Sequence, residues 1–116
     1  RHTVTATADA ARASTQRAVD IQVGAEGSLV AAGELSFATA RAACIAGARA
    51  VRAAATPTVT IDCGGVTRAD SAGVAVLVEW LRVGRKAGRE VRYVNLPSTV
   101  VAIARLSELD SLLAGN

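Results

Sequence analysis

Hydrophobic and polar residues alternate in three segments of the chain with the period of two that is typical of half-buried β-strands. These segments are residues 19–23, 58–63 and 90–95. Gly24–Gly27 provides a turn after the first segment, so we predict a hairpin partner at residues 29–33. Gly64 and Gly65 are expected to end the second segment, because paired glycines weaken a strand.

Between these segments, apolar residues recur at intervals of three and four, which is the spacing of an amphipathic helix. The first predicted helix has Ser36 as its N-cap, carries Phe37 and Val51 on its apolar face and ends near Ala55. Gly47 either weakens this helix or marks a close packing contact. Further helices are predicted from after Ser71 to near Gly88, at residues 98–106 and, as a short turn, at residues 109–113. The order β-β-α-β-α-β-α is typical of an α/β fold, a mixed β-sheet with an initial β-hairpin and crossover helices.

The helix that begins after Ser71 has apolar residues on two nearly opposite faces, at roughly 100° per residue. One stripe contains Val74, Leu77, Val78 and Leu81, and the other contains Val76, Trp80 and Val83. A sheet buries only one face, so the second stripe must contact a neighbouring helix, a partner or a membrane surface. Because Trp is enriched among interface hot spots, we predict that the second stripe binds a partner protein. In the alternative interpretation, the first helix covers Val76 and Val83 and leaves Trp80 partly exposed.

With 116 residues, of which 51% are hydrophobic, the chain has material for one aliphatic core. Residues 1–17 are small, polar and aperiodic, so we predict a disordered tail followed by one folded domain at residues 18–116. The apolar runs are shorter than the ~18 residues of a membrane span, and no secretory signal pattern is visible, which favours a cytoplasmic location. Cys44 and Cys63 have no partner at a metal-ligand spacing and are expected to be buried thiols.

Candidate catalytic residues are sparse. The single histidine, His2, lies in the predicted tail, so no Ser-His-Asp or Cys-His arrangement can form within the domain, and no Gly-rich stretch is followed by the Lys of a P-loop. We therefore expect no enzyme activity, no metal and no cofactor. The formal charge of +3 includes a basic run from Arg82 to Arg92, but Glu79 and Glu90 lie beside it and aromatic residues are few. Nucleic-acid binding is therefore not expected.

A four-residue element leads into the helix with two stripes: Asp70, Ser71, Ala72 and Gly73. Ser71 stands where a side-chain oxygen can accept a hydrogen bond from the first turn, which is a capping role that requires no further function. The stretch from Thr58 to Leu77 resembles the signature of STAS domains, a hydrophobic strand followed by an Asp-Ser-x-Gly turn and a helix. Gly33-Glu34-Leu35 is similar to the Gly-Glu-Leu that precedes the first helix of that family. The resemblance extends over about residues 19–113.

Within STAS domains, the chain is most similar to the small cytoplasmic subunit of the Mla-type phospholipid-transport ABC system. The similar segments are Val78-Glu79-Trp80-Leu81, Asn95-Leu96-Pro97 and Ala104-Arg105-Leu106-Ser107. The resemblance implies a STAS fold and a non-catalytic accessory subunit that docks on the transporter's ATPase subunit, at the cytoplasmic face of the inner membrane, with Ser71 important for function.

Two other functions remain open. The family's anti-sigma factor antagonists carry a phosphoacceptor at the position of Ser71, which implies a regulator that binds an anti-sigma kinase. Direct lipid binding is a third hypothesis. For either protein partner, the residues predicted to bind it are Ser71, Ala72, Val76, Trp80 and Val83.

Overall fold

The computed structural model describes residues 19–24 and 27–113, and the tail predicted at residues 1–17 lies outside them. The strands are β1 (Val19–Val23), β2 (Ser28–Leu35), β3 (Thr58–Ala69) and β4 (Glu90–Val94). The helices are α2 (Ala40–Ala53), α3 (Ser71–Lys86), α4 (Ser98–Leu106) and α5 (Asp110–Leu113). This order confirms the α/β architecture predicted from the sequence.

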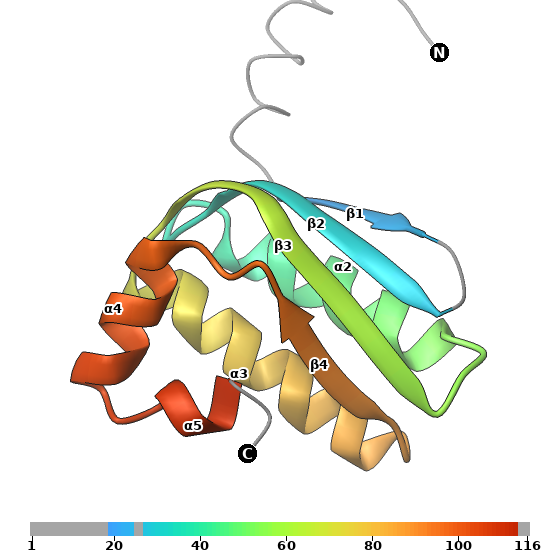
Figure 1. The fold of residues 1–116 in the computed structure, drawn as a ribbon. Helices are drawn as coiled ribbons and strands as arrows, with labels where there is room; N and C mark the ends of the chain where they lie inside the picture. Colours follow the sequence, from blue (N-terminus) through green and yellow to red (C-terminus); the bar gives the residue numbers. More distant parts are fainter. Residues whose placement is uncertain (1–18, 25–26, 114–116) are drawn as a thin grey trace, which may run out of the picture.

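The four described strands form one mixed sheet in the order β1-β2-β3-β4. β1 and β2 form the predicted antiparallel hairpin, whereas β2, β3 and β4 run parallel to one another. Alternate residues of β3, such as Val59, Ile61 and Cys63, are buried on one face. Helices α2 and α3 pack side by side beneath that face (Figure 1). Within the described residues, helices therefore cover one face of the sheet, as the alternation of residues predicts.

Strand β3 continues through Gly64 and Gly65, so the predicted break is wrong. Gly65 pairs with Ala32 of β2, and pairing then extends to Ala69 opposite Leu35, with register shifts along the way. A Cβ at Gly65 would lie 2.9 Å from the Cβ of Ala32. The glycine thus permits a close approach of two strands and does not end one of them.

Helix α2 begins at Ala40, three residues later than predicted, and Thr39 rather than Ser36 is its N-cap. The Thr39 hydroxyl donates to the carbonyl of Glu34 (2.8 Å) and accepts from the Ser36 amide (3.0 Å). These bonds hold residues 36–39 in a turn. As a result Phe37, which the spacing places on the apolar face of the helix, lies outside the helix and is 84% exposed.

Trp80 is the largest fully buried side chain among the described residues, with 0% exposure. Its indole N–H donates to the carbonyl of Cys44 on α2 (3.3 Å), and a Cβ at Gly47 would overlap the indole ring. Gly47 therefore marks the close packing contact that was one of its two predicted meanings. Helix α2 covers α3 completely at this point, because the glycine leaves room for the ring.

The two cysteines differ in their surroundings. Cys63 is buried, as predicted, and burial raises the pKa of its thiol from 9.0 to about 12. The protonated thiol is unreactive at neutral pH. Cys44 is half-buried.

None of the helices in the described part of the chain is long and apolar enough to cross a membrane. Across residues 19–24 and 27–113, no three His, Cys, Asp or Glu side chains gather where they would hold a metal ion.

Candidate functional site

Asp70 organises the N-terminal end of α3. Its backbone is extended, with φ −131° and ψ −170°, and its Oδ1 accepts from the amide of Gly73 (3.1 Å). Asp70, and not Ser71, is therefore the N-cap, which corrects the capping role considered for the serine. The carboxylate satisfies one of the free amides of the first turn and lies at the positive end of the helix dipole.

The same carboxylate connects α3 to the loop that precedes α2. Asp70 Oδ2 accepts from the amide of Phe37 (3.0 Å), and the Asp70 amide donates to the carbonyl of Leu35 (3.3 Å). Hydrogen bonds from the amide of Phe37 and, to a smaller extent, from those of Gly73 and Ala72 hold the pKa of Asp70 below its usual 3.8. Two segments that are far apart in the sequence are thus fixed to each other by one ionised side chain.

Gly73 allows this close packing. A Cβ at that position would overlap the carbonyl oxygen of Leu35, the last residue of β2. The first turn of α3 is buried against the end of β2 because residue 73 has no side chain. The glycine of the Asp-Ser-x-Gly element therefore has a steric function.

Ser71 and Ala72 reach the surface at this end of the helix. Ser71 is exposed and Ala72 is half-buried. In the described part of the chain, no hydrogen bond engages the Ser71 hydroxyl, since Asp70 already provides the cap. The hydroxyl is free to contact a partner or to be modified.

The structure contradicts the partner-binding role predicted for Val76, Trp80 and Val83. Their exposures are 5%, 0% and 7%, and all three belong to the core. The alternative interpretation is correct that the first helix covers Val76 and Val83, but Trp80 is covered as well. The reason is that α3 packs against α2 on one side and against β4 and α4 on another, so a single domain buries both stripes.

Phe37 is the residue that sequence reasoning missed. Its side chain is exposed, while its backbone is fixed to Asp70, the residue before Ser71. A signal for it was present in the sequence, because Thr39 is a good N-cap and a helix beginning after it leaves Phe37 in a loop. We define the α3 N-terminal surface as Phe37, Ser71 and Ala72.

Removing the Asp70 carboxylate is expected to loosen this surface. We predict that Asp70→Ala lowers the free energy of unfolding by about 0.5–2 kcal/mol, the usual cost of losing an N-cap. Urea denaturation measures the loss, with Asp20→Ala, a substitution at an exposed position, as the matched control.

The folded-state pKa of Asp70 is lowered. The ionised carboxylate therefore stabilises the folded protein at pH values above the usual pKa of 3.8, and this contribution is lost as the pH falls below it. Equal losses in both variants would contradict the capping role.

Comparison of the sequence and the structure with known proteins identifies the family to which the chain belongs. A family model described as "Mlab, STAS domain" matches residues 18–114. A search of curated proteins by sequence found no match.

Solved structures that share the fold include the following three. The anti-sigma factor antagonist SpoIIAA in its unphosphorylated form has a TM-score of 0.62 at 18% identity, over 80% of this chain and 83% of that one. The Bacillus cell fate determinant SpoIIAA in the phosphorylated form has a TM-score of 0.59 at 17% identity, over 80% and 86%. SLC26A9 has a TM-score of 0.54 at 16% identity, over 72% of this chain and 16% of its own. Because the family model covers nearly the whole chain, the protein belongs to the STAS domain family.

Proposed function

We propose that this protein is a protein-binding accessory subunit of an Mla-type phospholipid-transport ABC complex, and that the α3 N-terminal surface docks on the ATPase subunit. The description of the matching family model supports the type of complex. The proposal places the protein in the cytoplasm, peripheral to the inner membrane and held there by its partner. Its role is to bind and regulate, with no chemistry of its own.

The exposure of Phe37 is the observation that carries the docking site. A Phe side chain that is 84% exposed loses favourable burial unless another surface covers it. The Asp70 bond fixes the backbone of Phe37, so little backbone freedom is lost on binding. Aromatic side chains held on an ordered backbone often contribute most of the energy of an interface.

Ser71 gives this surface a means of control. A phosphate on its hydroxyl would place about −1.5 to −2 charges at the edge of the interface that Phe37 anchors. We predict that Ser71→Asp weakens binding of the ATPase subunit more than Ser71→Ala does. Surface plasmon resonance with both variants measures the difference. If the two variants bind equally well, phosphorylation does not control the interface.

Affinity purification from native membranes tests the proposed function itself. The full chain, tagged and expressed in its own cell, is expected to copurify with an ABC ATPase and its membrane subunits. Recovery of a soluble anti-sigma kinase, without membrane subunits, would instead support the rival function of a phosphorylation-switched regulator. That rival is consistent with the free Ser71 hydroxyl, but a fold shared with SpoIIAA at 18% identity does not carry the partner over.

A further inference from the structure

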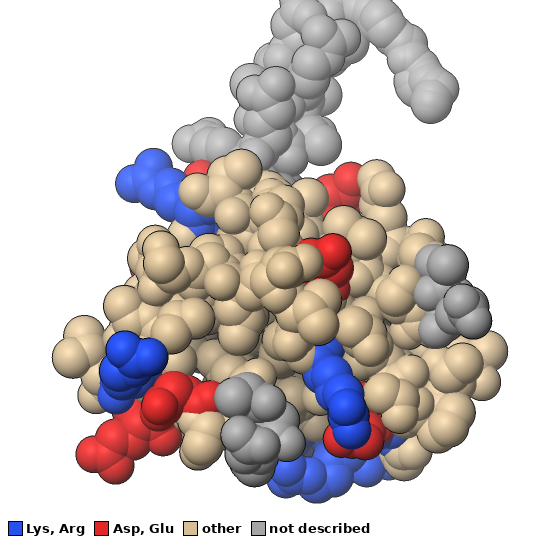
Figure 2. Space-filling view, in the orientation of Figure 1, with Lys and Arg blue, Asp and Glu red and all other residues tan. Residues whose placement is uncertain are grey.

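The basic residues between Arg82 and Arg92 do not act as one cluster in the folded chain. Arg92 pairs with Glu90 (3.1 Å), and Arg89 donates to two carbonyl oxygens at the end of α2 and just beyond it. The other cations of the run lie on the last turns of α3: Arg82, Arg85 and Lys86. Figure 2 shows Lys and Arg side chains gathered along the edge of the molecule below the C-terminal part of α3.

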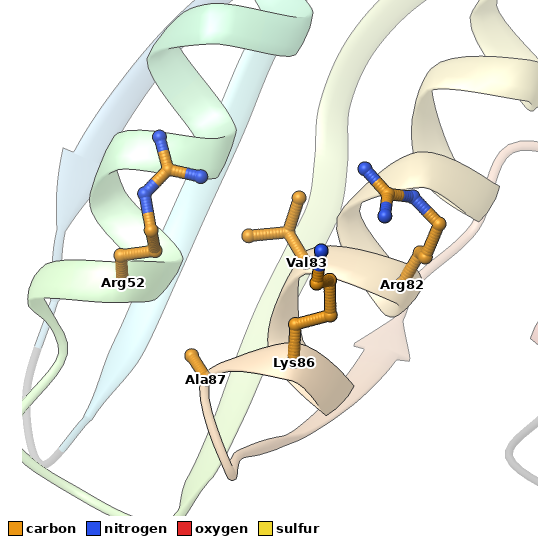
Figure 3. Close-up of a pocket in the computed structure, with 5 residues that line it drawn as sticks. All are labelled: Arg52, Arg82, Val83, Lys86 and Ala87. Atoms are coloured by element: carbon orange, nitrogen blue, oxygen red, sulfur yellow. The ribbon is translucent and has the colours of Figure 1, made fainter.

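A surface hollow of about 300 Å³ lies between the C-terminal ends of α2 and α3. It is lined by Arg52 from α2 and by Arg82, Val83, Lys86 and Ala87. Figure 3 shows Arg52 on α2 with its guanidinium turned toward α3, and Arg82 and Lys86 on α3 across from it. The lining is completed by the apolar side chains of Val83 and Ala87. We call this feature the basic hollow.

The charges of the basic hollow are not balanced within the described residues. Arg82 forms a two-pronged pair with Glu79, with Nε–Oε1 and Nη2–Oε2 distances of 3.0 and 2.5 Å. In residues 19–24 and 27–113, no carboxylate lies within ion-pair distance of Arg52 or Lys86. The three cations Arg52, Arg82 and Lys86 have one carboxylate, that of Glu79, beside them. About two positive charges of the hollow therefore have no negative partner.

Cations in the last turn of a helix usually complement the helix dipole, but the carbonyl groups here have other partners. The carbonyls of Val83, Gly84 and Arg85 accept from the amides of Ala87, Gly88 and Arg89. The carbonyl of Arg52 accepts from the Arg89 guanidinium. The side chains of Arg52 and Lys86 are thus not used as C-caps, and their head groups are available in the hollow.

We propose that the basic hollow binds the phosphate group of a phosphate ester. Arginine guanidinium groups bind phosphate with paired hydrogen bonds, and the lysine adds a point charge. A phosphate monoester carries about −1.5 to −2 charges at pH 7, which matches the two uncompensated charges. The apolar side chains at the hollow accommodate the carbon part of the ester. The site lies about 20 Å from Ser71 along α3, so it is independent of the proposed docking surface.

An NMR titration of the full chain with inorganic phosphate, replacing chloride at constant ionic strength, tests the site. Shifts are expected at the amides of Arg52, Val83 and Lys86. The double variant Arg52→Gln/Lys86→Gln is expected to lose phosphate affinity by at least about tenfold, the effect of removing two charged hydrogen-bond donors. The control Arg68→Gln/Arg105→Gln removes the same charge from exposed positions elsewhere and is expected to bind phosphate unchanged.

Vesicles distinguish the sources of the phosphate group. Binding to phosphatidylcholine vesicles that contain phosphatidic acid, a lipid whose head group is a phosphate monoester, lost in the Arg52/Lys86 variant and competed by inorganic phosphate, would assign the site to lipid head groups. Phosphate shifts without vesicle binding would assign it to a soluble ester. Equal phosphate affinity of the two double variants would overturn the proposal. An absence of phosphate-dependent amide shifts would overturn it as well. That result would leave an acidic protein segment as the alternative ligand of the basic hollow.

Discussion

Replacing Trp80 with Ala is expected to lower the free energy of unfolding by about 3–5 kcal/mol, the range for truncating a buried aromatic side chain. The Trp80 side chain is fully buried where α3 packs against α2, and its removal leaves a cavity between the two helices. The carbonyl of Cys44 also loses its indole donor. A loss of this size is a large fraction of the stability of a small domain. Urea denaturation followed by circular dichroism measures it.

Leu106→Ala is the control for the Trp80 substitution, because Leu106 is a large apolar residue that is 87% exposed. Its effect on the free energy of unfolding is expected to stay within about 0.5 kcal/mol, as is usual for surface positions. If Trp80→Ala also unfolds at nearly the wild-type urea concentration and abolishes partner binding, Trp80 is an interface residue and the packing described for α3 is wrong.

Gly73→Ala is expected to have the second largest effect, a loss of about 1–3 kcal/mol or more, because it overpacks the junction of α3 and β2. The new Cβ overlaps a backbone carbonyl oxygen, that of Leu35, which cannot rotate away as a side chain would. The first turn of α3 must therefore move, and the bonds of Asp70 to Gly73 and Phe37 are strained with it. The substitution should reduce both stability and partner binding.

The exposed Ala75, two residues further along α3, provides the matched control. Ala75→Ser changes the same helix without touching β2 and is expected to alter the free energy of unfolding by no more than about 0.5 kcal/mol. Thermal or urea unfolding of the two variants measures the contrast. A Gly73→Ala protein as stable as Ala75→Ser would contradict the contact between α3 and β2.

Local patterns were sufficient to predict most of the fold. The alternation at residues 19–23 and 58–63 identified strands, and the spacing at residues 98–106 predicted α4 with the observed bounds. Glycines were harder to interpret, because their effect depends on what lies opposite. Gly65 faces Ala32 across a strand pair and leaves the strand intact.

The candidate site was predicted less well for a physical reason. An apolar stripe on a helix shows that the face is apolar but not what covers it. Here α2 covers the stripe, because Gly47 has no side chain and the indole ring of Trp80 packs directly against it. The spacing of Phe37 fits a helix face, whereas the hydrogen bonds of Thr39 hold a turn and the helix starts after it. The position of Ser71 at the surface agrees with the predicted partner contact, which stays a prediction.

Affinity for the ATPase subunit, measured for Phe37→Ala beside Leu106→Ala, tests the proposed docking surface most directly. Both variants remove an apolar side chain that is more than four-fifths exposed, at 84% and 87%, so their effects on folding should be equally small. We predict that Phe37→Ala weakens binding by at least about tenfold, as for an interface hot spot, and that Leu106→Ala binds as the unmodified protein does. Equal affinities of the two variants would contradict docking through the α3 N-terminal surface.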